Sequence, residues 1–263
     1  SVGDGTQVVL LHGFPDGTES WEPVASALAA AGHRAIVPYL RGYHPDTIVV
    51  GRTYGRAEFA EDVVHLLDAL ELDSAVLAGH DWGAAHVWST VGSHPDRVRA
   101  VVPIAIPHPA CITPSPRLIW GVRHFFYFKA PWSERLAARF DFAYSEGLYR
   151  RWSPRWNGPQ RDGAVARAKE MFREPSVLHE ALQYYRDLSF SPDPASKFRM
   201  SCPGLLVAGA EDFGGDMAPY EASVERFDAP AELLVVAGAG HWPHAEGEPE
   251  FIQALLKLVD SVS

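Results

Sequence analysis

Short apolar runs alternate with amphipathic helical patterns along this chain, and no other feature of the sequence restricts the fold as much. The apolar runs occupy residues 8–11, 35–39, 75–78, 100–104, 205–208 and 233–236. Runs that are apolar at every position are typical of strands buried on both faces of a parallel sheet, and the helical stretches between them are typical of β-α-β units. The chain is therefore predicted to be an α/β protein, with a mostly parallel sheet flanked by helices.

The middle of the chain departs from this rhythm. Residues 107–198 show helical patterns without a convincing strand, and they contain four of the eight tryptophans. We therefore predict a helical cap over residues 107–198, inserted between two parts of one core at residues 1–106 and 199–263. The arginines of the cap are expected to form a solvated helical face: Arg135, Arg139, Arg150, Arg151 and Arg167.

Composition limits the partners and the compartment. The chain has 23 basic and 33 acidic residues, and its formal net charge of −10 disfavours nucleic acid and membrane surfaces as partners. No apolar stretch approaches the ~18 residues that a membrane span requires. We find no secretory signal pattern at the N-terminus, and Cys111 and Cys202 are expected to be free thiols, so we expect a cytoplasmic protein.

The segment Gly79-His80-Asp81-Trp82-Gly83 lies between a predicted strand and a predicted helix, which is the setting of a nucleophile elbow. In such a turn the central residue takes a strained positive φ, and the flanking glycines leave room for the strand and the helix to approach. Asp81 therefore stands at the nucleophile position. An aspartate is already ionised at neutral pH, and a carboxylate attacks a saturated carbon that carries a leaving group, which gives an alkyl-enzyme ester.

Water must cleave that ester, and this step needs a histidine as general base with a carboxylate to orient it. Asp212 and His241 each follow a predicted strand of the second part of the core, so both are expected near the elbow. Asp81, Asp212 and His241 are therefore the predicted catalytic residues. The alternatives within the same two loops are Glu211, Asp216 and His244.

An anion site for the tetrahedral intermediate is predicted at the loop after the first strand. Phe14, in His12-Gly13-Phe14-Pro15, is placed to donate its backbone N–H, and Trp82, directly after the nucleophile, is placed to donate a second. His12 is expected to hold this loop. His80, beside the nucleophile, is expected to be a hydrogen-bonded structural histidine.

These motifs resemble those of the α/β-hydrolase superfamily, and within it the epoxide hydrolases, over nearly the whole chain. His12-Gly13-Phe14-Pro15-Asp16 resembles their oxyanion loop, Gly79-His80-Asp81-Trp82-Gly83-Ala84 their nucleophile motif and Gly240-His241-Trp242 their histidine motif. The resemblance implies the α/β-hydrolase fold with an inserted helical cap, and hydrolysis of an epoxide to a vicinal diol with no cofactor and no metal. The family begins with two further strands, and these N-terminal edge strands are expected to be missing here, since only residues 1–7 precede the first predicted run.

The resemblance also implies proton donors in the cap, since opening an epoxide expels a basic alkoxide. In Leu182-Gln183-Tyr184-Tyr185-Arg186, Tyr185 matches the family's ring-opening tyrosine, with Tyr184 as the alternative. Many members place a second tyrosine seven residues before a proline, and this chain has His124 there. A His and Tyr pair resembles the Cif-type bacterial branch, so His124 is implied as the second donor.

Substrate contacts are implied for Phe14, Trp82, Phe125, Tyr184 and Trp242. The aromatic residues of the cap favour an apolar epoxide, and packing in the core explains them equally well. They are Trp120, Phe125, Phe126, Tyr127 and Trp132. The expected partner is a small-molecule substrate, and a homodimer is left open.

Two other functions compete with this interpretation. A haloalkane or haloacetate dehalogenase shares the fold and the aspartate, but Phe14 has no side-chain donor for a halide. Trp82 and Ala85 stand where fluoroacetate dehalogenases carry arginines, so a carboxylate substrate lacks its clamp. From a different class, a non-catalytic receptor with this fold predicts the loss of a triad residue, and this sequence has all three.

Overall fold

The computed structural model describes residues 1–51, 53–189, 197–213 and 215–263. Its strands are β1 (Gln7–Leu11), β2 (Arg34–Ile36), β3 (Ala75–His80), β4 (Val98–Ile104), β5 (Gly204–Gly209) and β6 (Ala231–Val236). They form one parallel sheet in the order β2-β1-β3-β4-β5-β6. The predicted α/β class is confirmed, and each predicted apolar run overlaps a strand.

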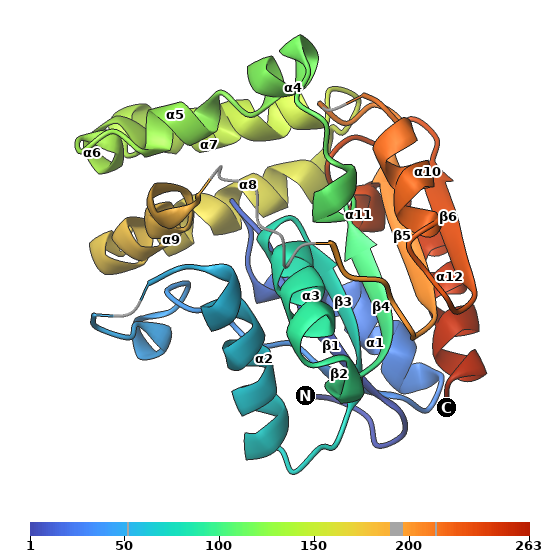
Figure 1. The fold of residues 1–263 in the computed structure, drawn as a ribbon. Helices are drawn as coiled ribbons and strands as arrows, with labels where there is room; N and C mark the ends of the chain where they lie inside the picture. The colour runs from blue at the N-terminus through green and yellow to red at the C-terminus, as the bar shows by residue number, and fades with distance from the viewer. Residues whose placement is uncertain (52, 190–196, 214) are drawn as a thin grey trace.

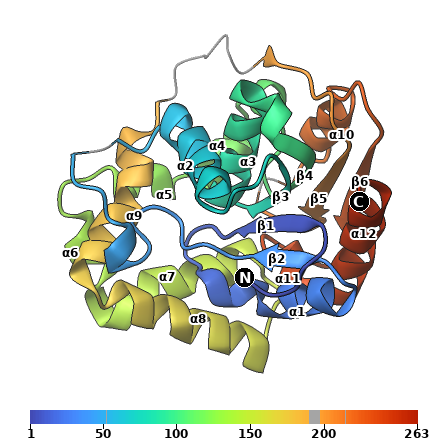
Figure 2. The same ribbon diagram turned by 90° about the horizontal axis from the view of Figure 1, so that it is seen from below.

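Helices cover both faces of this sheet (Figures 1 and 2). The helices that flank the sheet are α1 (Glu22–Ala30), α2 (Arg56–Ala69), α3 (Trp82–Ser93), α10 (Ala218–Val224) and α12 (Glu248–Ser261). Strand side chains alternate between the faces, so Val9 and Leu11 pack with α2 and α3, whereas Val8 and Leu10 pack with α1 and α12. Burial on both faces explains why the strands are apolar at every position.

The second predicted strand is shorter than expected. We expected residues 35–39, but β2 ends at Ile36, two residues before Pro38. Proline has no N–H to donate to a neighbouring strand, which opposes continuation of the pairing. Ahead of β1, Val2 forms a single antiparallel bridge to Ala35, and no strand precedes β1 in the described part of the chain.

Between β4 and β5 the described residues contain helices and no strand. These helices are α4 (Pro116–Gly121), α5 (His124–Phe128), α6 (Ser133–Ala137), α7 (Arg139–Trp152), α8 (Pro159–Phe172) and α9 (Pro175–Asp187). We call them the helical layer; Figure 1 shows it above the sheet, at the end where the strands point. The division at residues 107 and 198 stays a prediction, and residues 190–196 lie outside the described residues.

Short elements complete the chain. They are α11 (Pro243–Glu246) and the 3-10 helices η1 (Thr18–Trp21), η2 (Pro45–Thr47), η3 (Pro95–Arg97) and η4 (Pro109–Cys111). Cys111 and Cys202 are free, as expected. No helix in the described ranges has both the length and the apolar character needed to cross a membrane.

Several aromatic residues of the helical layer lie at the surface, which corrects an expectation. Trp120, Phe126 and Trp132 were expected at the substrate site or in the core, but all three are exposed. On α5, His124 and Phe128 face inward four residues apart, which turns Phe126 outward. The five arginines expected on a solvated face are exposed, as predicted.

Candidate active site

Asp81 lies on the turn between β3 and α3, with φ 52° and ψ −114°. This backbone conformation is strained for any residue with a side chain. Two glycines permit it: a Cβ on Gly79 would lie 2.2 Å from the carbonyl oxygen of Gly83, and a Cβ on Gly83 would lie 2.1 Å from that of Leu11. The turn has the geometry of a nucleophile elbow, and its carboxylate stands at the N-terminal end of α3, where a negative charge is favoured.

The structure brings Asp81, Asp212 and His241 together. His241 Nδ1 lies 2.9 Å from Asp212 Oδ2, and His241 Nε2 lies 3.3 Å from Asp81 Oδ2. The imidazole is buried, whereas the Asp81 side chain remains partly exposed. Asp212 lies 131 positions after Asp81 in the sequence, and His241 lies 29 positions after Asp212. The three side chains nevertheless form one hydrogen-bonded chain, because Asp212 and His241 follow β5 and β6 at the same end of the sheet as the elbow.

Two carboxylates set the charge of the histidine. Burial alone would lower the pKa of His241, but Asp212 and then Asp81 outweigh it and raise that pKa to about 10. The imidazole is therefore protonated at neutral pH. A protonated imidazole is not a base, so His241 becomes one only after a neighbouring negative charge is removed.

The loop after β1 contacts the nucleophile directly. The backbone N–H of Phe14 donates a hydrogen bond of 2.9 Å to Asp81 Oδ1. His12 holds the loop as expected, since its Nε2 accepts from the backbone N–H of Leu40 at 3.2 Å. Trp82 is the first residue of α3, directly after Asp81. The arrangement supplies one observed backbone donor at the carboxylate, and the role of the Trp82 N–H stays a prediction.

Tyr185 on α9 faces the elbow from the helical layer. Its ring lies 5.1 Å from that of Trp82 and 5.3 Å from that of Phe14. The hydroxyl is buried and has no hydrogen-bond partner among the described residues. Burial, and next the charge of Asp81, hold the pKa of Tyr185 well above its usual value, so the proton stays on. An orphaned buried hydroxyl costs about 1–3 kcal/mol, and a bound substrate oxygen would remove that cost.

His124 on α5 lies beside Tyr185, with ring centroids 5.4 Å apart. Burial lowers the pKa of His124 to about 3, so the ring is neutral at pH 7. Its Nδ1 lies 3.4 Å from the carbonyl oxygen of Gly121, which only accepts, so in this bond the proton is on Nδ1 and Nε2 is an acceptor. His124 therefore donates through Nε2 only in its other tautomer, and Tyr185 is the donor that needs no rearrangement.

Of the remaining residues implied to contact substrate, Phe125 lies at this site. Its ring stacks on Trp82 at 6.2 Å and lies 5.1 Å from Tyr185. Tyr184 contributes only its ring, 5.2 Å from Trp82, because its hydroxyl donates to the carbonyl of Arg41 at 2.9 Å.

The ring of Trp242 packs elsewhere. It stacks on Tyr149 at 4.3 Å and lies 5.7 Å from Trp156, so it supports the histidine loop from the side of the helical layer.

The alternatives for the triad have other partners. Glu211 forms an ion pair of 2.7 Å with Arg155. Asp216 accepts a hydrogen bond from the backbone of its own loop. His244 is buried, and its ring stacks on Trp21 at 4.7 Å. None of the three takes part in the hydrogen bonds that join Asp81, His241 and Asp212.

Glu246 and Ser153 are important residues that the sequence analysis missed. Glu246 accepts hydrogen bonds from the backbone N–H groups of Gly240 and Trp242, at 3.0 and 3.1 Å. Ser153 donates to Glu246 at 2.6 Å and accepts from the backbone N–H of His241 at 2.9 Å. These bonds hold three successive N–H groups of the histidine loop. A glutamate five residues after the histidine was the only signal, and Ser153 had none.

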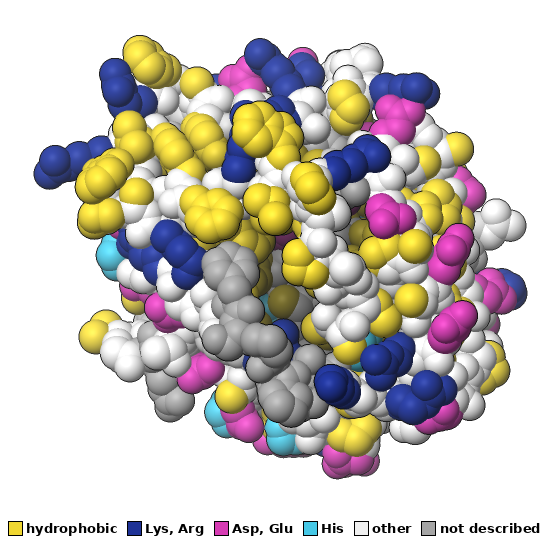
Figure 3. All heavy atoms as spheres, turned by 45° about the horizontal axis from the view of Figure 1, so that its top comes forward, with side chains coloured by type: hydrophobic (Ala, Val, Ile, Leu, Met, Phe, Trp, Pro, Cys, Tyr) yellow, Lys and Arg dark blue, Asp and Glu magenta, His cyan; other side chains and the backbone are white. Residues whose placement is uncertain are grey.

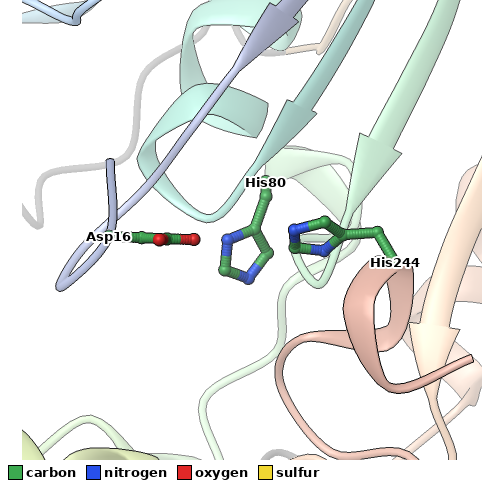
Figure 4. Close-up of side chains that lie close together, drawn as sticks. All are labelled: Asp16, His80 and His244. Carbon is green, nitrogen blue, oxygen red and sulfur yellow. The ribbon is translucent and has the colours of Figure 1, made fainter. Parts of the chain in front are cut away.

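Asp16, His80 and His244 form a second buried cluster behind the site (Figure 4). One ligand-type atom from each lies within 4.8 Å of the others, so these residues are the described candidates for a metal. His80 Nε2 donates to the carbonyl of His241 at 2.7 Å, which leaves its Nδ1 as an acceptor. Burial raises the pKa of Asp16 to about 7, so a protonated Asp16 carboxyl supplies a donor. Asp16 Oδ2, His80 Nδ1 and both ring nitrogens of His244 are buried and make no hydrogen bond to any described residue.

Comparisons with known proteins agree with this architecture. Residues 6–248 match the family described as alpha/beta hydrolase fold. The epoxide hydrolase of Caballeronia sordidicola is 27% identical, over 99% of this chain and 89% of that protein. Epoxide hydrolase A of Mycobacterium tuberculosis is 29% identical, over 96% of this chain and 89% of that protein.

Solved structures show the same fold. A crystal structure from Klebsiella pneumoniae has a TM-score of 0.85 at 27% identity, covering 98% of this chain and 92% of that one. The epoxide hydrolase from Vigna radiata has a TM-score of 0.81 at 22% identity, covering 99% and 92%. The chain therefore belongs to the α/β-hydrolase fold family, and the Caballeronia and Mycobacterium relatives, which it resembles over 89% of their length, are named epoxide hydrolases.

Proposed function

We propose that this protein is an epoxide hydrolase that converts an apolar epoxide to a vicinal diol through an ester at Asp81. One observation carries the proposal. The Asp81 carboxylate, at a nucleophile elbow, is hydrogen-bonded to His241 and faces Tyr185, whose hydroxyl has no hydrogen-bond partner among the described residues. The names of the relatives support the same reaction. The helical layer, in this proposal, is the cap that encloses the substrate.

Ring opening is the first step. Asp81 attacks a ring carbon, the carbon–oxygen bond of the epoxide breaks, and Tyr185 gives its proton to the leaving alkoxide. His124 holds the same oxygen and donates to it after its proton moves to Nε2. The product is a hydroxyalkyl ester of Asp81.

The ester changes the charge around His241. An esterified Asp81 is neutral, so one of the two carboxylates that raise the pKa of His241 is gone. His241 then releases its proton, which replaces the one lost by Tyr185. The histidine reaches the second step as a neutral base, oriented by Asp212.

Hydrolysis is the second step. His241 takes a proton from water, and the hydroxide attacks the ester carbonyl of Asp81. The Phe14 and Trp82 N–H groups stabilise the oxyanion. The intermediate then expels the alkoxide of the product, which takes the proton of the new carboxyl group and leaves as the diol, so Asp81 is again a carboxylate and His241 is protonated, as at the start. Phe14, Trp82 and Phe125 give the site aromatic walls, which favour an apolar substituent on the epoxide.

Product analysis tests the reaction class. The purified protein is incubated separately with styrene oxide, 1-bromobutane and fluoroacetate, and diol is measured by chromatography and halide by electrode. We expect diol from styrene oxide and no halide. Release of halide from fluoroacetate or 1-bromobutane, with no diol from styrene oxide, would show that the protein is a dehalogenase. Tyr185 and His124 would then be hydrogen-bond donors to the halide.

The His241→Gln variant tests the covalent step. Ring opening needs Asp81 and Tyr185, whereas ester hydrolysis needs the base, so this variant should accumulate the ester. Intact-protein mass spectrometry should show the added mass of styrene oxide, and peptide mapping should locate it at Asp81. The double variant Asp81→Asn/His241→Gln is the control and should stay unmodified. Label on another residue would contradict the mechanism.

A further inference from the structure

The outer side of the helical layer exposes large apolar side chains. We define the aromatic face as Ile119, Trp120, Phe126, Trp132 and Phe140. These side chains are between 52% and 80% exposed, and every exposed tryptophan and phenylalanine of the described residues belongs to the face. Proteins that stay in water rarely leave so many large aromatic groups uncovered in one segment, so the face is a candidate interaction surface.

The same segment concentrates positive charge. Residues 107–139 carry five basic residues and one acidic residue, whereas the rest of the chain carries 18 basic and 32 acidic residues. The acidic one, Glu134, is already paired with Arg186 at 2.8 Å and with His179 at 2.9 Å, both on α9. The net charge of −10 therefore conceals a positive region on one side of the molecule.

The arginines of this region lie among the aromatic groups. Arg123 lies 4.5 Å over the ring of Trp120, and Arg139 lies 5.0 Å over that of Phe140. Neither has a carboxylate partner within the described part of the chain. Figure 3 shows hydrophobic side chains interspersed with Lys and Arg side chains over the outer side of the helical layer, with few acidic side chains among them.

A cavity of about 300 Å³ adjoins the face. Arg117, Arg123 and Arg151 line it together with Trp120. Burial, and also the nearby charge of Arg123, lower the pKa of Arg151. Like charges gathered in one cavity repel, and an anionic group placed between them would remove that repulsion.

This combination of groups indicates what covers the face. A second copy of the chain, docked by two-fold symmetry, would bring the positive region against itself, because such an interface pairs one patch with the same patch. A bilayer surface with anionic lipids instead satisfies both components, since aromatic rings settle at the level of the headgroups and arginines bind phosphates. We propose that the aromatic face docks this protein on membranes that contain anionic lipids, with a lipid phosphate held in the arginine-lined cavity.

Docking would also serve the candidate active site. The cavity is bounded by Trp152 and Phe213, whose rings lie 4.9 and 5.1 Å from that of His241. On α5, Phe126 points outward while His124 points to the site. An apolar substrate dissolved in the bilayer would thus lie one helix thickness from the nucleophile. The binding itself does not depend on which reaction the site catalyses.

Vesicle sedimentation tests the proposal directly. The purified protein is mixed with vesicles of phosphatidylcholine alone, or of equal parts phosphatidylcholine and phosphatidylglycerol, and the bound fraction is measured. We expect at least ~10-fold tighter binding to the anionic vesicles, and loss of most of this difference at ~1 M salt. Equal binding to both vesicles, or none to either, would overturn the proposal.

Matched variants locate the surface. Trp120→Ser/Phe126→Ser should lose at least ~5-fold in binding to the anionic vesicles, and Arg117→Gln/Arg123→Gln should lose the preference for them. Tyr39→Ser/Val50→Ser removes two exposed apolar side chains outside the face and should bind as the unaltered protein does. Circular dichroism confirms that each variant is folded.

Light scattering separates the rival occupant. The mass of the protein is measured at low protein concentration and without vesicles. A dimer that becomes a monomer in Trp120→Ser/Phe126→Ser would show that a second copy covers the face, and would overturn the membrane proposal. We expect a mass that these substitutions do not change.

Discussion

At the scale of single residues, the site works through the balance of charge around one imidazole. His241 is buried between two carboxylates, and the reaction proposed here removes one of them and later restores it. The strain at Asp81 and the glycines beside it place that carboxylate where both the histidine and the Phe14 N–H reach it. The charge of Asp81 therefore keeps His241 protonated in the free enzyme, and its loss in the ester makes His241 a base for the second step.

Replacing Asp81 by asparagine should lower the pKa of His241. The amide is neutral, as the ester is, so the substitution reproduces the electrostatic change of the first step without the chemistry. We expect the pKa of His241 to fall from about 10 by at least ~1 unit. Histidine ring NMR over a pH titration measures it. Asp212→Asn should cause a larger fall, since Asp212 contributes more than Asp81; the reverse order would contradict this account.

The tautomer of His124 leads to a ranking of the cap residues. Tyr185→Phe should slow ester formation by ~10²-fold or more, since it removes the donor that needs no rearrangement. His124→Phe should slow it less, and Tyr184→Phe less than Tyr185→Phe, because the Tyr184 hydroxyl is used by Arg41. Rapid-quench measurement of the ester in a His241→Gln background reads this step alone. A greater loss for His124→Phe would mean that Nε2 carries the proton when substrate binds.

At the scale of elements, the end of α7 joins the helical layer to the catalytic loop. The carbonyl of Trp152 and the hydroxyl of Ser153 both accept from the backbone N–H of His241. The Trp152 ring lies 4.9 Å from that of His241 and 4.7 Å from that of His124. The proposed base and the proposed cap donor are thus positioned by one turn of chain.

Glu246 should be a positioning residue for this loop. Glu246→Gln keeps one oxygen for these N–H groups but places an amide NH₂ against the N–H of Gly240, where Oε2 now accepts, so we expect a loss of about 1–3 kcal/mol in the free energy of unfolding. Urea denaturation measures it. Ester hydrolysis should slow more than ester formation, since the His241 imidazole is displaced and Asp81 is not. Glu250→Gln, an exposed glutamate four residues on, should change stability by no more than ~0.5 kcal/mol.

At the scale of the whole molecule, three distant segments meet in the cluster of Asp16, His80 and His244. The loop after β1, the end of β3 and α11 each place one buried polar side chain there, and His80 contacts the carbonyl of His241. This meeting has a consequence for stability, because Asp16 holds its proton more tightly in the folded chain than in the unfolded one.

The free energy of unfolding should fall as the pH rises, because Asp16 ionises. Burial raises its pKa from 3.8 to about 7, so its contribution to stability is complete below pH ~4 and is lost as the pH rises through about 7. Between pH 5 and 8 this loss amounts to ~3 kcal/mol. Asp16→Asn cannot ionise and should lack this component. Urea denaturation of both proteins at the two pH values measures it; parallel changes in both would exclude Asp16 as the source.

The sequence by itself determined what depends on local rules. Runs that are apolar at every position predicted the six parallel strands, because a strand buried on both faces has no polar side. Gly79-His80-Asp81-Trp82-Gly83 predicted the elbow, because only glycine fits beside a strained turn. The order of the strands' loops predicted that Asp212 and His241 would reach Asp81, since parallel strands end at one edge of the sheet.

Only the tertiary structure decided what depends on burial and on contacts between distant segments. It set the charge of His241 and the use of the Tyr184 hydroxyl, because these follow from contacts with Asp81 and Arg41, which lie 160 and 143 residues away in the chain. It revealed Ser153 and Glu246 as supports of the histidine loop. It also showed that an acidic chain has a positively charged aromatic face, because the net charge of a sequence does not tell where each charge lies in the folded molecule.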